Sequence, residues 1–103
     1  MIEVDALMVR VYLCESDHEL NPLLKCLHDE LKVRGVTVVR GIAGFGQSGA
    51  VHAASLLDLS LDLPLVLEFF DDPDKVRRAL TRLNDFVAPG HVVTWPIKIE
   101  MSD

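Results

Sequence analysis

Apolar and polar residues alternate along four stretches of the chain with the two-residue period that is typical of β-strands. The alternation is clearest in residues 7–13 and 93–99. Residues 36–42 are rich in β-branched side chains, and residues 63–70 carry Pro64 near their start, where a missing N–H costs least. The sequence therefore predicts four strands.

Between these strands, two stretches have apolar residues at helical spacing. Asn21 and Pro22 predict an N-cap and a first-turn proline for a helix that ends near Arg34, with Gly35 as its left-handed C-terminal stop. Residues 71–73 (DDP) predict the capped start of a second helix. Its expected buried stripe consists of Val76, Ala79, Leu80, Leu83 and Phe86.

The resulting order β-α-β-β-α-β predicts a ferredoxin-like α+β fold, in which two helices cover one face of an antiparallel sheet. A chain of 103 residues has the size of one domain, so residues 1–103 are expected to form a single domain. No helix is left to cover the second face of the sheet. The residues expected on that face are Met8, Arg10, Tyr12, Val66, Glu68, Phe70 and Lys98. Such a mixture of apolar and pairable charged side chains suits a subunit interface, so an oligomer is expected.

Residues 41–49 contain four of the six glycines and are predicted to form a loop. The segment 44–61 is expected to be a long, partly mobile excursion, because its helical pattern is broken. Residues 44–49 (GFGQSG) spell GxGxxG, but the next clear element is a strand and the chain is too short for a Rossmann fold. Two explanations of the glycines remain open: an anion-binding nest, or a hinge that needs positive φ angles.

The charge balance argues against nucleic acid as a partner. Ten Lys and Arg against sixteen Asp and Glu give a net charge of −6, opposite to the basic surface that nucleic-acid binding requires. Acidic residues near the start do not match a signal peptide, and no apolar run reaches the length of a membrane helix. A cytoplasmic location is expected.

Residues that could carry catalysis or hold a metal are present but not arranged in a recognised pattern. The potential metal ligands are His18, His28, His52, His91, Cys14 and Cys26, which are spread without the spacing of a zinc site. The two cysteines are expected to be buried free thiols. Ser48 and Ser55 lie near His52, yet neither sits in a nucleophile elbow. The sequence therefore predicts no enzyme, no metal and no cofactor.

Residues 39–46 (VRGIAGFG), then His52, then residues 59–68 (LSLDLPLVLE) closely resemble the signature of the uncharacterised family called domain of unknown function 190. The resemblance implies a PII-like protein. PII-like proteins are ferredoxin-like trimers that bind small effectors, often adenine nucleotides, in clefts between subunits. Their long loop between the second and third strands docks onto partners such as membrane transporters, channels or enzymes. In this chain that loop would be 44–61.

The chain departs from PII proteins between the second helix and the last strand. PII proteins hold nucleotide phosphates there with a loop that bears glycine and lysine, whereas residues 87–91 (VAPGH) contain no lysine. The implied role is that of a non-enzymatic regulatory homotrimer with a small effector, an adenine nucleotide or another anion. The expected ligand-binding residues are Arg40, Gly41, Gly44, Phe45, Gly46 and His52.

In this hypothesis Arg40 supplies positive charge, the glycine amides donate hydrogen bonds, and Phe45 stacks on a planar base. Two alternatives stay open. Arg40 pairs with Glu68 inside the oligomer, or the chain is a metal-handling trimer that resembles divalent-ion-tolerance proteins and uses His52 and His91.

Overall fold

A four-stranded antiparallel sheet forms the body of the protein. The computed structural model describes residues 1–45, 51–53 and 62–103, with the backbone alone for 51–53. The strands lie in the order β2-β5-β1-β6. Their bounds are β1 Ile2–Cys14, β2 Thr37–Arg40, β5 Pro64–Asp71 and β6 Val92–Met101. The helical elements are a 3₁₀ turn η1 Glu15–Asp17, α1 Leu20–Lys25, a π-helical turn η2 Cys26–Glu30 and α2 Pro73–Leu83.

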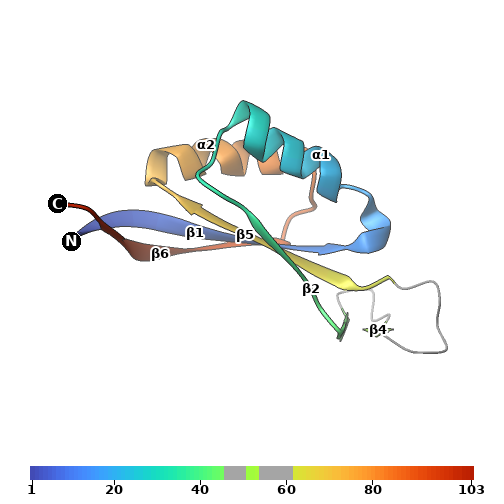
Figure 1. Ribbon diagram of the computed structural model, residues 1–103. Coiled ribbons are helices and arrows are strands. Elements are labelled where there is room, and N and C mark those ends of the chain that lie inside the picture. Colours follow the sequence, from blue (N-terminus) through green and yellow to red (C-terminus); the bar gives the residue numbers. More distant parts are fainter. Residues whose placement is uncertain (46–50, 54–61) are drawn as a thin grey trace.

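Both helices lie on one face of this sheet, and the other face has no helix over it (Figure 1). The chain termini lie together at one end of β1 and β6, where the N-terminal amine contacts Asp103 at 3.0 Å. The predicted α+β, ferredoxin-like architecture with two helices on one face is confirmed.

The core lies between the sheet and the helices and follows the alternation of β5. Leu65, Leu67 and Phe69 are buried on the helix side, while the residues between them are partly exposed on the open face. The predicted stripe of α2 is confirmed at Val76, Ala79 and Leu83. Phe86 also packs against the core, although it lies just beyond the end of the helix. Fully burying one such side chain stabilises the fold by roughly 1.5–3 kcal/mol.

The ends of the first helix differ from the prediction. It starts at Leu20 after Glu19, so Asn21 is not its N-cap and Pro22 is its third residue. A proline is tolerated there because the first four N–H groups of a helix have no partner within it. The predicted stop at Gly35 is wrong: the last turn is π-helical, and Lys32 takes the left-handed conformation with φ 52°.

Part of the predicted loop 41–49 is a strand. β3 (Ala43–Phe45) pairs antiparallel with β4 (Val51–Ala53) in a separate two-stranded sheet, which places Gly44 opposite His52. An extended backbone satisfies its N–H and C=O groups by this pairing. The expected mobile excursion covers 44–61; of these residues, 44–45 and 51–53 belong to strands, and 46–50 and 54–61 lie outside the described residues.

Within the ranges that the structure describes, no helix has the length and apolar character needed to cross a membrane.

Candidate ligand-binding site

A cavity of about 350 Å³ lies at the end of the sheet where β1 finishes and β5 begins. The antiparallel order brings the end of β2 and the start of β6 to the same edge. Side chains from the sheet and from the β3 strand meet there. Its lining includes Tyr12, Asp17, Gly41, Gly44, Phe45 and His91.

A second cavity of about 320 Å³ adjoins the first, because Tyr12, Leu13, Asp17 and His91 line both. On its other side it is lined by residues 86–88, which connect α2 to β6. The two cavities therefore flank the same residues and form one candidate site with two halves.

Two predicted glycines line the first cavity, where they let the chain pass close to Pro64. A Cβ atom on Gly41 would lie 2.8 Å from Pro64 Cγ, and one on Gly44 would lie 3.2 Å from the same atom. Neither glycine has a positive φ, so the prediction of a positive-φ hinge is wrong for both. The Gly41 amide donates to the Pro64 carbonyl at 2.7 Å, so this amide is already used within the chain.

Phe45 is the most available aromatic ring at the cavity. It ends β3 and is 77% exposed. A large exposed aromatic side chain at a cavity rim can stack on a planar ligand. Two further predicted residues belong to the same hairpin region: His52 lies opposite Gly44 in the backbone register, but its side chain lies outside the described residues, as does the whole of Gly46.

Arg40 lies outside this cavity within one subunit. It stands opposite the core residue Leu65, so its side chain leaves the sheet on the helix side. There it forms an ion pair with Glu15 and lines a separate cavity of about 260 Å³. The alternative, in which Arg40 pairs with Glu68 inside an oligomer, stays a prediction; within this chain Glu68 is bound by Arg10.

Arg10 holds together the polar part of the open sheet face. Its Nε donates to Glu68 Oε1 at 2.5 Å, and its guanidinium lies 5.1 Å from the centroid of the Trp95 ring. Hydrogen bonding to Tyr12 and then to Glu68 raises the pKa of Arg10. Tyr12 and Arg10 lie on the same face of β1, because they are two residues apart in the strand.

Sequence reasoning did not assign Asp17, Tyr12 and His91 to this site. The Tyr12 amide donates to the His91 carbonyl at 2.9 Å, and His91 Nδ1 lies 3.3 Å from the Tyr12 carbonyl. Asp17 Oδ2 accepts from the Cys14 amide at 2.9 Å. One signal pointed to part of it: the segment 87–91, which contains His91, lies where PII proteins hold nucleotide phosphates.

The cysteines are not placed as nucleophiles. Cys26 is buried as expected, whereas Cys14 is only partly buried. Burial raises the pKa of both thiols, so both are held in the protonated form, which is a poor nucleophile. The metal alternative stays a prediction: no three His, Cys, Asp or Glu side chains gather among the described residues, but His52 is outside them.

A family model, DUF190 (“Uncharacterized ACR, COG1993”), matches residues 6–99. Among curated proteins, a UPF0166 protein of Aquifex aeolicus is 32% identical over 80 residues, which cover 74% of this chain and 76% of that protein. UPF0166 protein MJ1524 of Methanocaldococcus jannaschii is 31% identical over 88 residues, covering 82% of this chain and 81% of its own.

Solved structures show the same fold at low sequence identity. CPII of Thiomonas intermedia K12, a nitrogen regulatory PII-like protein bound to ADP, AMP and bicarbonate, gives a TM-score of 0.73 at 19% identity, over 95% of this chain and 91% of CPII. The putative PII-like signaling protein TTHA0516 of Thermus thermophilus gives a TM-score of 0.64 at 17% identity, over 96% of this chain and 91% of TTHA0516. CutA1 of Oryza sativa gives a TM-score of 0.62 at 14% identity, over 97% of this chain and 84% of CutA1.

Proposed function

The chain belongs to the DUF190 family, and from this premise we propose that it is a non-enzymatic, single-domain PII-like regulatory protein of the cytoplasm that binds a small effector. The observation that carries the proposal is the two-part cavity at the sheet end, with exposed Phe45 at its rim, on a fold shared with CPII. CPII is bound to ADP, AMP and bicarbonate. An adenine nucleotide is therefore the ligand class proposed here.

The size and lining of the cavity support a ligand with a planar, largely uncharged part. Volumes of about 350 and 320 Å³ fall at the small end of the range for small-molecule sites. Phe45 offers a face for stacking, and Tyr12 and His91 offer polar groups. Among the described residues that line either half, none is a lysine or an arginine.

This lack of cations in one subunit supports a site between subunits. Phosphate groups require positive charge or amide donors, and within one subunit the described lining offers Asp17 and Glu19, which are negative, and His91. We propose that a neighbouring subunit of a homotrimer completes the site. The contributions of Arg40, Gly46 and His52 to it, and the docking of the 44–61 loop on a transporter or channel, belong to the same proposal.

Titration calorimetry with ADP, AMP and bicarbonate tests this function. The matched variants are Phe45→Ala and Ile42→Ala, because both side chains are strongly exposed and only Phe45 lines the cavity. Stacking of a base on an aromatic ring is worth roughly 1–3 kcal/mol, so Phe45→Ala is expected to weaken nucleotide binding by about five- to 150-fold. Ile42→Ala should bind like the unchanged chain.

Two results would count against the proposal. If the unchanged protein binds neither nucleotide at millimolar concentration, the effector class is wrong. If Phe45→Ala and Ile42→Ala bind with equal affinity to the unchanged protein, the nucleotide lies elsewhere.

A further inference from the structure

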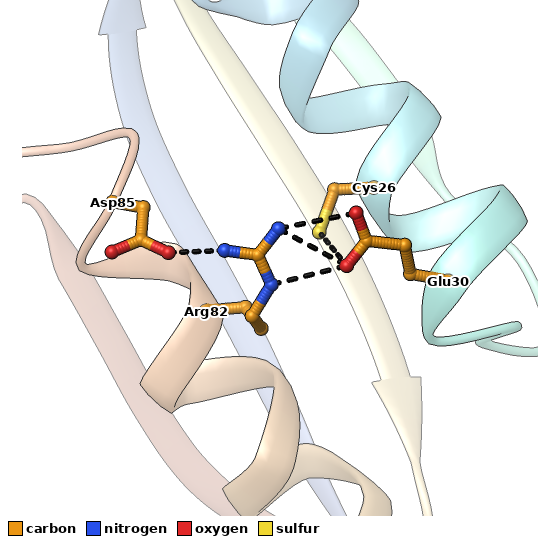
Figure 2. Close-up of polar contacts among 4 residues, drawn as sticks. All are labelled: Cys26, Glu30, Arg82 and Asp85. Atoms are coloured by element: carbon orange, nitrogen blue, oxygen red, sulfur yellow. Dashed lines mark hydrogen bonds and ion pairs between the residues drawn. The ribbon is translucent and has the colours of Figure 1, made fainter.

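Arg82, in the last turn of α2, joins the two helical elements that cover the sheet. Its Nε donates to Glu30 Oε2 and its Nη2 to Glu30 Oε1, both at 3.1 Å, so the guanidinium holds the carboxylate with two donors. A third nitrogen contacts Asp85 (Figure 2). One side chain thus connects η2, α2 and the segment that follows α2.

The η2 side of this contact is fixed by the π-helical turn. The Leu31 amide donates to the Cys26 carbonyl at 3.1 Å, five residues back, which closes the wider turn. Within it the Cys26 sulfur donates to Glu30 Oε2 at 3.8 Å. Burial raises the pKa of Cys26, so the thiol keeps the proton that it donates. Glu30 thus has a contact within η2 as well as its two contacts with Arg82.

The other side of the contact leads to the candidate site. The Arg82 guanidinium lies 5.7 Å from the centroid of the Phe86 ring. The Asp85 amide donates to the Arg82 carbonyl at 3.0 Å, and the Phe86 and Val87 amides donate to the Leu83 carbonyl. Phe86 and Val87 line the second half of the cavity, together with Ala88 and His91.

We propose that Arg82 is a positioning residue for the ligand site, and that it sets the place of residues 86–91 by holding Asp85 and Phe86 while anchored on Glu30. This inference rests on the proposed function. The Arg82 and Glu30 side chains are 36% and 55% exposed, and ion pairs with that exposure contribute little to global stability. The contacts of Arg82 with Asp85 and Phe86 place its effect on the segment that lines the cavity.

Arg77 supplies a matched control on the same helix. It forms a surface ion pair with Asp74 at 3.0 Å, one turn apart, and it does not line either half of the cavity. Replacement of either arginine by methionine keeps an unbranched apolar stem and removes the charge. Arg82→Lys keeps the charge but loses the two-donor geometry toward Glu30.

Amide hydrogen exchange of the ligand-free protein tests the positioning role without reference to any effector. In Arg82→Met the amides of Phe86, Val87 and His91 are expected to exchange about tenfold faster, because local opening becomes easier while the core stays closed. Arg82→Lys should lie in between, and Arg77→Met should exchange like the unchanged chain. Unchanged protection of these three amides in Arg82→Met would overturn the inference.

Calorimetry with ADP then tests the consequence for binding. Arg82→Met is expected to bind ADP about tenfold more weakly than the unchanged chain, and Arg82→Lys is expected to recover part of the affinity. The melting temperature of Arg82→Met should be close to that of Arg77→Met. Faster exchange with unaltered ADP affinity would overturn the link to the site. If the unchanged protein does not bind ADP, the proposed function fails, and the exchange experiment still decides whether Arg82 positions residues 86–91. Should Arg82→Met not fold, Arg82→Lys and Glu30→Gln carry the same comparison.

Discussion

Two adjacent acids, Asp71 and Asp72, do different work although the sequence predicts a single capping role for both. Asp72 accepts a hydrogen bond from the Lys75 amide at 3.0 Å and is the N-cap of α2. Asp71 is buried and accepts from two amides instead, that of Arg34 at 2.9 Å and that of Asp72 at 2.8 Å. Asp71 therefore ties the segment before β2 to the start of α2.

The Asp72 cap predicts a pH-dependent melting temperature. The hydrogen bond from the Lys75 amide lowers the pKa of Asp72 below its ordinary value of 3.8. Because the pKa of Asp72 is lower in the folded chain than in the unfolded chain, the carboxylate stabilises the fold at any pH above the unfolded-state pKa. This stabilisation is lost as the pH falls through the folded-state pKa. Asp72→Ala should therefore melt a few degrees lower than the unchanged chain at pH 7, with the gap shrinking toward pH 3. A gap that is constant or widens in acid would contradict this. Asp72→Asn, which keeps a neutral cap, is the control.

Gly41 and Gly35 predict opposite outcomes for the same substitution. A Cβ on Gly41 would lie 2.8 Å from Pro64 Cγ, which forces a shift, whereas a Cβ on Gly35 meets nothing within 4 Å and needs no positive φ. In urea unfolding, Gly41→Ala is expected to lower the free energy of unfolding by about 1–3 kcal/mol. Gly35→Ala is expected to raise it by roughly 0.4–1 kcal/mol, through reduced entropy of the unfolded chain. Equal effects at the two positions would show that Pro64 yields without cost.

At the scale of elements, the four strands of the main sheet and α2 could be predicted because their signals lie within each segment. These signals are the alternation of apolar and polar residues in the strands and the Asp72-Pro73 start of α2. The first helix was harder. The helix begins two residues before Pro22, and its end at Lys32 follows a π-helical turn that no spacing rule reveals. The β3–β4 pairing was missed for a similar reason: strands of three residues are too short to show the alternation by which strands are recognised.

The candidate site was predictable only in part. Phe45 and the glycines stand in the family signature, and the structure places Gly41, Gly44 and Phe45 at one cavity. Asp17 and residues 86–88 contribute through tertiary contacts between segments far apart in the chain, which the sequence alone does not bring together. The role of Arg82 became clear only from distances between side chains, because the sequence alone does not distinguish Arg82 from Arg77 on the same helix.

At the scale of the whole molecule, the open face of the sheet is apolar and has a paired charge at its centre. Arg10 and Glu68 stand opposite each other and form an ion pair, so neither is left as an isolated charge on this face. Around them lie exposed apolar side chains, including Val39, Tyr12 and Val93. Cross-strand register places Val39 opposite Val66 on this same face. We propose that this face is the one on which copies of the chain meet.

Val39→Glu tests that interface and the trimer together. Light scattering of the unchanged chain is expected to give about three times the monomer mass, since burying the apolar face between copies is favourable. A carboxylate at position 39 would be buried without a partner and close to Glu68, at a cost of several kcal/mol, so the variant should dissociate at micromolar concentration. Its circular dichroism should stay unchanged, because residue 39 is exposed within one subunit.

Thr81→Glu, an equally charged change on an exposed position of α2, should remain trimeric. A monomeric unchanged chain would refute the trimer, and a trimeric Val39→Glu would place the interface on a different surface.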